Sequence, residues 1–240
     1  MRKVQFAKGN IYHIYNRGVE KRDIFIDNKD RWRFLQGLFL FNDVKTSSSL
    51  LWEFERSNQG LNFKTIKAYF SNSENNRDPL IKIMGDCLMP NHYHLIVEEL
   101  CDGGISKFMH KLGTGYTNYF NKRYNRVGGL FQGTFKAALV DNDSYLSYLI
   151  AYVNVINPGQ LVEPNLKEEG IKNKEKVIEF ANNYLWSTHK EYLQTRDSII
   201  IDKGILGEIF PDGKRYEEFI ESVLLRKSKF EGMSQLLFDY

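Results

Sequence analysis

The chain has few cysteines and a net charge close to zero, and each of these features argues against a class of protein. Only Cys87 and Cys101 occur among 240 residues, without a CxxC pair, so neither a disulfide framework nor a zinc ribbon is expected. The 33 basic and 30 acidic residues leave a net charge of +3, which alone does not indicate nucleic-acid binding. No apolar run is long enough to span a membrane, and the N-terminus lacks the apolar stretch of a signal peptide. We therefore expect a cytoplasmic protein with no membrane partner.

Apolar periodicity predicts alternating strands and helices in the first two thirds of the chain. Strands are predicted over 11–16, 80–84, 91–98 and 130–140, and helices over 29–41, 105–124 and 144–156. The order strand, helix, strand, strand, helix, strand is that of the ferredoxin-like split βαβ sandwich. We expect this α+β fold, with an antiparallel sheet and helices on one face.

Two stretches fall outside that plan. Residues 42–78 are polar and rich in Ser and Asn, so we interpret them as an insertion. Residues 159–240 contain helical patterns near 175–192 and 216–229 and are expected to form a mostly helical C-terminal extension. The predicted domains are therefore 1–158, with its polar insertion, and the extension 159–240.

His92 and His94 are the most informative residues of the sequence. They flank Tyr93 in a predicted strand, and residues two apart on a strand point to the same face. Two neighbouring imidazoles on a rigid strand begin a site for a divalent metal ion. The alternative is two unrelated histidines on a half-buried strand, and His13 is itself expected to be a packed strand histidine.

A central stretch interleaves basic and aromatic side chains. The basic residues are Lys107, Lys111, Lys122, Arg123, Arg126 and Lys136. Lysine and arginine neutralise phosphates, while aromatic rings stack on bases, so the stretch favours binding of single-stranded nucleic acid. For Lys122 and Arg123 a solvated helix end that complements the helix dipole is an equal alternative.

The last helix of the predicted domain carries three tyrosines on one face. Tyr145, Tyr148 and Tyr152 are three and four residues apart, a spacing that brings side chains together on a helix. Tyrosine also packs well in cores, so the pattern alone leaves a nucleophile and a core residue as alternatives.

An ordered series of short blocks carries a resemblance to a known family. The blocks are Tyr12–Gly18, Ile24-Phe25, Asp30-Arg31, Met89–Ile96, Gly129–Lys136, Tyr152 with Asn157-Pro158, and Leu185–Thr188. Together they resemble the HUH-type single-tyrosine transposases, and within them most closely the REP-associated tyrosine transposases, which are domesticated relatives of small insertion-sequence transposases. The resemblance covers roughly residues 8–190.

The resemblance implies a metal-dependent endonuclease and strand transferase for hairpin-containing single-stranded DNA. His92 and His94 would bind Mg²⁺ or Mn²⁺ with Asn157, and Tyr152 would form a 5′-phosphotyrosine. The resemblance places Gln132 and Lys136 near bound DNA, and we interpret Arg17 as a further phosphate contact. It also implies a homodimer that pairs through its sheets, and the alternative is a monomer in which residues 190–240 cap that sheet edge. The expected location is the cytoplasm, with association to the nucleoid when DNA is bound.

One departure from the family pattern concerns the catalytic helix. The family's metal-binding amide usually follows the nucleophile by four residues, whereas Asn157 follows Tyr152 by five. Either the helix has a one-residue bulge, or the amide ligand is Asn154, or the ligand comes from elsewhere. Tyr148 remains the alternative nucleophile. The competing functions are a DNA-binding protein of the same fold with impaired catalysis and, more weakly, an unrelated metal-dependent hydrolase.

Overall fold

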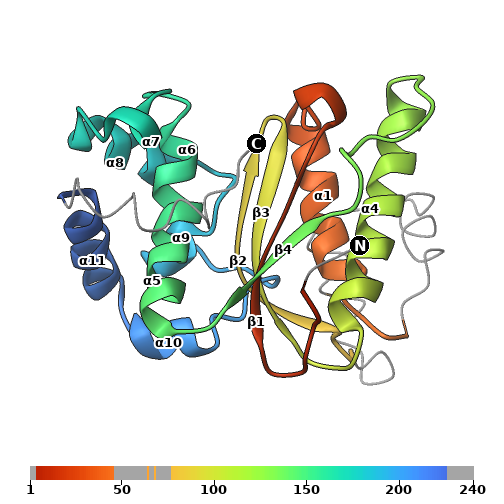
Figure 1. Cartoon of the computed structure of the whole chain (residues 1–240), viewed down its shortest axis with the longest axis horizontal. Coiled ribbons are helices and arrows are strands. Elements are labelled where there is room, and N and C mark those ends of the chain that lie inside the picture. The colour runs from red at the N-terminus through yellow and green to blue at the C-terminus, as the bar shows by residue number, and fades with distance from the viewer. Residues whose placement is uncertain (1–3, 46–63, 65–67, 69–76, 226–240) are drawn as a thin grey trace.

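A four-stranded antiparallel sheet lies at the centre of the molecule (Figure 1). The computed structural model describes residues 4–45, 64, 68 and 77–225. The strands are β1 (Ile11–Arg17), β2 (Ile81–Met89), β3 (His92–Glu99) and β4 (Lys136–Val140). Their order in the sheet is β2-β3-β1-β4, with every neighbouring pair antiparallel. This topology confirms the α+β, split βαβ fold.

Two long helices cover one face of the sheet, as the sequence predicts. These are α1 (Asn28–Leu40) and α4 (Gly104–Arg123), which lie side by side in Figure 1. Asp27 and Asp30 form a capping box at the start of α1, which satisfies backbone donors of the first turn. Alternate residues of β3, among them Tyr93 and Leu95, are buried in the hydrophobic core beneath these helices.

The other face of the sheet is covered by helices that follow β4. The helices are α5 (Asp143–Ala151), a π-helical turn (Tyr152–Ile156), α6 (Asn157–Gly159), α7 (Leu166–Glu169), α8 (Lys174–Asn183), α9 (His189–Tyr192), α10 (Ile205–Ile209) and α11 (Gly213–Leu225). Ile96 of β3 shares a second core with Val177 of α8 and Tyr216 of α11. Because the extension and α5 share this core, both faces of the sheet carry helices. The division into 1–158 and 159–240 stays a prediction.

Some boundaries differ from the prediction for local reasons. β4 begins at Lys136 rather than at residue 130, because Gly133 adopts a positive φ that interrupts an extended strand. Most of the predicted insertion 42–78 lies outside the described residues. Among the described helices, none is both long and apolar enough to cross a membrane.

Candidate active site

The two histidines of β3 face the side of the sheet that α5 and the extension cover. His92 lies opposite Arg17, and His94 opposite Tyr15, in the antiparallel ladder with β1. The two imidazole rings are 5.1 Å apart, centroid to centroid. Tyr93 points to the opposite face, where it is buried in the first core. The shared face that the strand period predicts is therefore present.

The π-helical turn brings Asn157 to the same place. The backbone N–H of Asn157 donates to the carbonyl of Tyr152, five residues earlier, instead of the α-helical four. Pro158 follows directly, and it lacks the N–H that would continue an α-helical ladder. The wider turn leaves Oδ1 of Asn157 3.3 Å from Nε2 of His92.

Asn154, the alternative amide, is engaged elsewhere. Its side chain donates to the hydroxyl of Tyr216 at 3.0 Å and accepts from the hydroxyl of Thr188 at 2.8 Å. It therefore points toward the C-terminal extension. The spacing of five residues between Tyr152 and Asn157 is therefore explained by a one-residue bulge in the helix.

Neighbouring amides orient the pair of His92 and Asn157. Nδ1 of His92 is 2.6 Å from Oδ1 of Asn91, so it carries the proton, and the Nε2 of a neutral ring is then an acceptor. Gln160 donates to Oδ1 of Asn157 at 3.1 Å, which identifies the atom facing His92 as the carbonyl oxygen. Two acceptors thus face each other.

Facing acceptors at this distance suit a cation between them. Ligands at about 2.1 Å from an octahedral ion lie about 3 Å apart, close to the 3.3 Å between these two atoms. No group of three His, Cys, Asp or Glu side chains able to hold a metal ion occurs among the described residues. A site here would therefore need the amide oxygen of Asn157 as its third protein ligand.

His13 on β1 is a partner of His94 that sequence reasoning did not identify. Its Nε2 lies 2.8 Å from Nδ1 of His94, and both side chains are buried. A hydrogen bond at Nδ1 leaves Nε2 as the nitrogen through which His94 would bind a metal, and such partners fix ring orientation. The strand period alone could have placed His13 on this face, but not its contact with a particular ring.

Tyr152 lies directly beside the histidines. Its ring centroid is 5.5 Å from that of His94 and 6.4 Å from that of His13, edge to face in both cases. The residue is 1% exposed, and its hydroxyl accepts a hydrogen bond of 2.8 Å from Nζ of Lys167. Tyr148, one turn earlier, is buried in the second core, and burial raises the pKa of its hydroxyl well above the usual range.

Three of the expected DNA contacts lie near this site. Arg17, at the end of β1, donates from Nε to Oε1 of Gln132 at 2.6 Å, and the backbone N–H of Gln132 donates to the carbonyl of Arg17. Lys136 lies opposite Tyr15 in the ladder and has its ammonium 5.9 Å from the Tyr15 ring centroid. Arg17 ends β1, which pairs with β3, whereas Lys136 begins β4 on the other side of β1 and Gln132 precedes β4.

The basic residues of α4 lie across the sheet from the histidines. Lys107, Lys111 and Lys122 belong to a helix that covers the opposite face (Figure 1). Lys111 donates to the carbonyl of Asp43 at 2.7 Å, and burial lowers the pKa of its ammonium.

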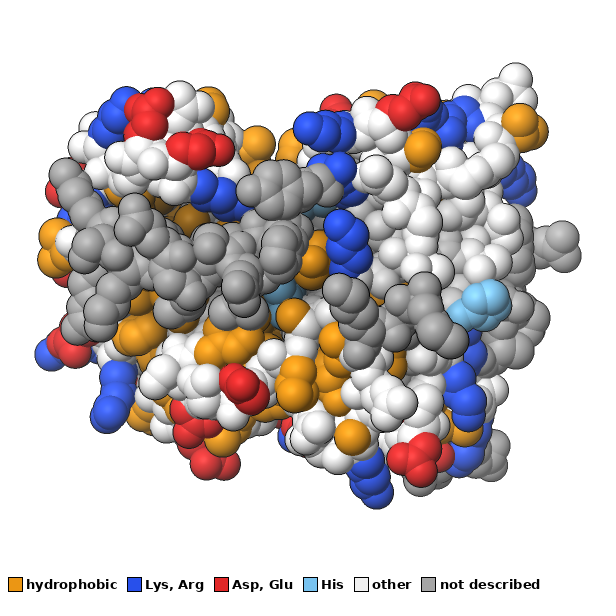
Figure 2. Space-filling model, in the orientation of Figure 1, with side chains coloured by type: hydrophobic (Ala, Val, Ile, Leu, Met, Phe, Trp, Pro, Cys, Tyr) orange, Lys and Arg blue, Asp and Glu red, His pale blue; other side chains and the backbone are white. Residues whose placement is uncertain are grey.

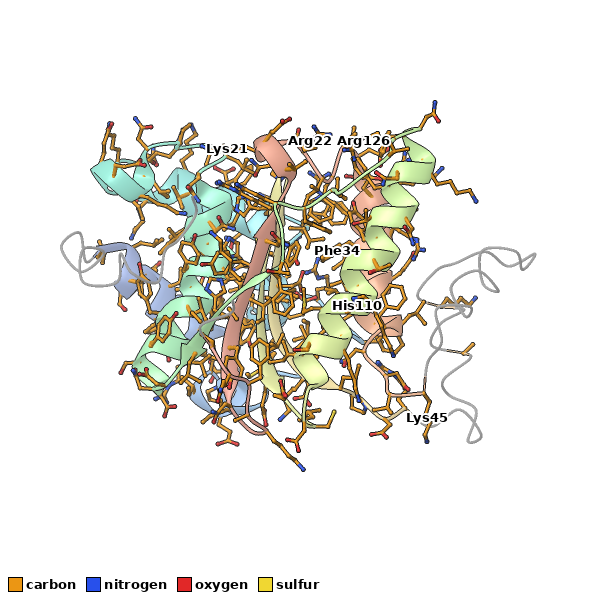
Figure 3. The ribbon with its side chains drawn as sticks, turned by 45° about the vertical axis from the view of Figure 1, so that its right-hand side comes forward. Lys21, Arg22, Phe34, Lys45, His110 and Arg126 are labelled. Carbon is orange, nitrogen blue, oxygen red and sulfur yellow. The ribbon has the colours of Figure 1, made fainter. Side chains whose placement is uncertain are left out.

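Three basic side chains lie together at one end of the sheet. Arg126 follows α4 and lies at the same end of the sheet as Lys21 and Arg22 (Figure 3). Figure 2 shows Lys and Arg side chains along this upper edge, with acidic side chains among them. The predicted basic stretch is thus divided between two faces and one end of the sheet.

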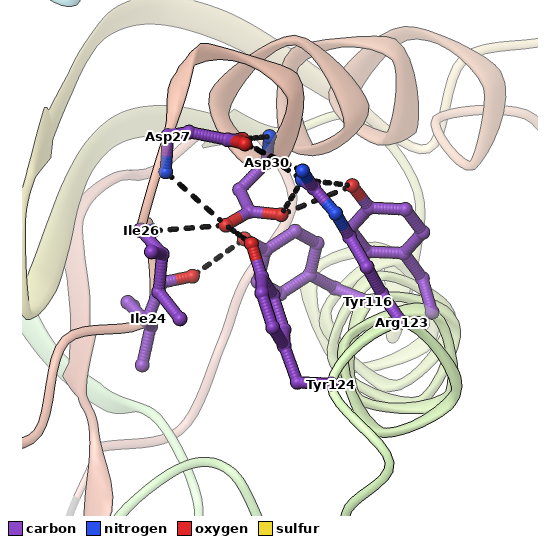
Figure 4. Close-up of polar contacts among 8 residues, drawn as sticks. Ile24, Ile26, Asp27, Asp30, Tyr116, Arg123 and Tyr124 are labelled. Atoms are coloured by element: carbon purple, nitrogen blue, oxygen red, sulfur yellow. Dashed lines mark hydrogen bonds and ion pairs between the residues drawn. The ribbon is translucent and has the colours of Figure 1, made fainter.

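Arg123 has a structural role within the protein. It forms ion pairs with Asp27 and with the fully buried Asp30, and it donates to the hydroxyl of Tyr119 (Figure 4). The hydrogen bond from Arg123 lowers the pKa of Asp27 to about 2. The expectation that Arg123 contacts DNA stays a prediction, but its guanidinium is already used in joining α4 to the start of α1.

One family model matches part of this chain. Residues 60–155 match the family model described as "Transposase IS200 like", so the insertion-sequence transposase family expected from the motifs is confirmed for this segment. A search of curated proteins gives no match. Among solved structures, one described as "Structure of the REP associates tyrosine transposase bound to a REP hairpin" is similar at 11% identity. That match covers 84% of this chain and 96% of that chain, with a TM-score of 0.46.

Proposed function

We propose that this chain is a metal-dependent endonuclease and strand transferase that cleaves hairpin-containing single-stranded DNA through Tyr152. The observation that carries the proposal is the convergence of four groups at one point of the sheet. His92, His94, Asn157 and Tyr152 come from β3 and the π-helical turn, and the facing acceptors of His92 and Asn157 suit a cation. All four belong to a single chain, so a partner subunit need not supply the nucleophile, and a homodimer stays a prediction.

In the proposed reaction, the Tyr152 hydroxyl loses its proton to solvent as Oη attacks the scissile phosphorus, and the bond from phosphorus to O3′ breaks. The electron pair of that bond remains on O3′, which takes up a proton and leaves as a free 3′-OH. The 5′ end stays joined to Tyr152 as a phosphotyrosine diester. A bound Mg²⁺ or Mn²⁺ would neutralise and orient the phosphate, which a weak nucleophile such as tyrosine needs. The ester retains the bond energy, so a 3′-OH can reverse the step.

A covalent complex tests the proposal. Labelled single-stranded hairpins incubated with the protein and Mn²⁺ or Mg²⁺ should give a complex that survives SDS. Tyr152→Phe should abolish this complex with folding and hairpin binding retained, because one hydroxyl contributes little packing. Tyr148→Phe is the matched control on the same helix face and should retain most of the activity. Inactive Tyr148→Phe together with active Tyr152→Phe would move the nucleophile by one helical turn.

Binding without cleavage is the second candidate function. The five-residue spacing no longer supports it, since the π-helical turn accommodates the extra residue. The burial of Tyr152 does favour it, because a nucleophile that is 1% exposed must become accessible before it meets a phosphate. Tight hairpin binding by the wild-type protein, with no adduct for any hairpin or metal tried, would select this function.

Both functions predict the same binding preference. Arg17, Lys136 and the basic end of the sheet should make hairpin binding weaken steeply between low and physiological salt, since each neutralised phosphate releases counterions. Filter binding at several salt concentrations, with a blunt duplex as the control, measures this. Salt-independent binding, or equal affinity for duplex and hairpin, would contradict the choice of DNA ligand.

A further inference from the structure

Lys167 comes from the C-terminal extension and reaches the candidate nucleophile. It lies on α7, beyond the segment 60–155 that matches the transposase family. Its Nζ donates a hydrogen bond of 2.8 Å to the hydroxyl of Tyr152 and lies 4.9 Å from the centroid of the same ring. The adjacent Leu166 is 2% exposed and belongs to the second core, so the backbone beneath Lys167 is held by packing.

The ammonium of Lys167 restrains the phenol at its hydroxyl. Its hydrogen bond selects one rotation of the O–H, and the same Nζ lies 4.9 Å from the ring centroid. His94 meets the same ring edge to face, with its centroid 5.5 Å away. The ring is therefore held between the histidine of the sheet and the ammonium of the extension.

A cationic donor at this oxygen has a chemical consequence. Negative charge builds on the phenol oxygen when its proton is lost during attack, and it builds there again when the phenol leaves in the reverse step. A positioned ammonium stabilises such charge strongly in a site from which water is excluded. The same donor thus serves both directions of the reaction.

We propose that Lys167 is a further catalytic residue, which orients the Tyr152 hydroxyl and stabilises its charge during cleavage and rejoining. This role rests on the proposed function. The bonds exchanged are those already described, from Oη to phosphorus and from phosphorus to O3′, and Lys167 keeps its three protons throughout. The extension would then complete the active site, in addition to covering the sheet.

The test compares substitutions at Lys167 with one at a nearby lysine. Lys167→Met removes the cation with little change in side-chain volume, Lys167→Arg retains a cationic donor, and Lys172→Met is the control. Lys172 lies on the same segment but pairs with Glu169 at the surface. The measurements are the single-turnover rate of adduct formation, the rate of rejoining by an added 3′-OH strand, hairpin affinity and the melting temperature.

Lys167→Met should slow adduct formation on the order of 100-fold, as does removal of one charge-stabilising donor in other active sites. Rejoining should slow by a similar factor, while hairpin affinity stays at the wild-type level. Lys167→Arg should retain part of the rate, and Lys172→Met all of it. In Lys167→Ala, added ethylammonium should restore adduct formation with saturation, whereas tetramethylammonium at equal ionic strength should not, because it has no N–H to donate.

Several results would overturn the role of Lys167. One is adduct formation by Lys167→Met at the wild-type rate or faster. Another is a Lys167→Met variant that loses only hairpin affinity. A third is slow adduct formation by Lys167→Ala that added ethylammonium does not restore. If the wild-type protein forms an adduct and any of these holds, only the role of Lys167 fails. If the wild-type protein forms no adduct at all, the proposed function fails and this role fails with it.

Discussion

Replacing Arg123 by methionine should destabilise the fold far more than it weakens DNA binding. Asp30 is fully buried and accepts hydrogen bonds from Arg123 at 2.6 Å, from the hydroxyls of Tyr119 and Tyr124, and from the backbone N–H of Ile26. The substitution removes the only cation among these donors. It leaves a carboxylate in a place that water does not reach.

The size of the effect follows from this geometry. Breaking a buried ion pair by removing one partner costs about 3–5 kcal/mol. The side chain of Arg123 is 25% exposed, whereas that of Asp30 is not exposed at all. Four neutral donors to Asp30 remain, because the backbone N–H of Asp27 also donates to it. We therefore expect a loss of about 3 kcal/mol, the lower end of that range.

Urea denaturation of the wild type, Arg123→Met and Lys122→Met measures the loss. Lys122 is the exposed neighbour on the same helix end, and its substitution should change the free energy of unfolding by less than about 0.5 kcal/mol. Adding Asp30→Asn to Arg123→Met should restore part of the stability, because a neutral amide does not need a cation. The reasoning is refuted if Arg123→Met is as stable as Lys122→Met while its hairpin affinity falls.

Three further outcomes are expected. The double substitution His92→Ala/His94→Ala should remove calorimetric binding of Mn²⁺, and equal heats for both proteins would contradict the metal site. Burial lowers the pKa of His189 to about 4 from an ordinary value near 6.5, so its stabilising contribution is full above pH 6.5 and is lost as pH falls toward 4. The wild type should then lose about 3 kcal/mol relative to His189→Gln in chemical denaturation across that window, and parallel pH profiles would disprove this. A Cβ on Gly85 would lie 2.8 Å from Cδ1 of Ile150, so Gly85→Ala should cost about 1–3 kcal/mol. Gly113→Ala on α4, where nothing lies within 4 Å, should instead stabilise by up to about 1 kcal/mol, and similar melting temperatures for the two variants would contradict the packing argument.

Local patterns were sufficient for the fold and for half of the candidate site. Strand alternation places His92 and His94 on one face whatever surrounds the sheet, because the period of two is a property of the extended backbone. The order of strands and helices likewise restricts the topology to a few arrangements, of which the split βαβ plan is one. The predicted end of the helix that carries Tyr152 was wrong: the helix continues through Pro158 to Gly159, because proline is tolerated in the first turn of a helical segment.

Local sequence patterns could not predict contacts between segments that are distant in the sequence. Whether the helix widens by one residue at Tyr152 depends on how its end packs against β2 and α8, since an α-helix and a π-turn have nearly the same sequence preferences. The bond between His13 and His94 and the bond between Lys167 and Tyr152 join residues 81 and 15 positions apart. Arg123 was indistinguishable from a DNA contact until Asp30 was found beneath it. Side-chain identity and spacing determine which face of an element a residue occupies. The ion pairs and hydrogen bonds that its side chain forms are determined only by how the elements pack together.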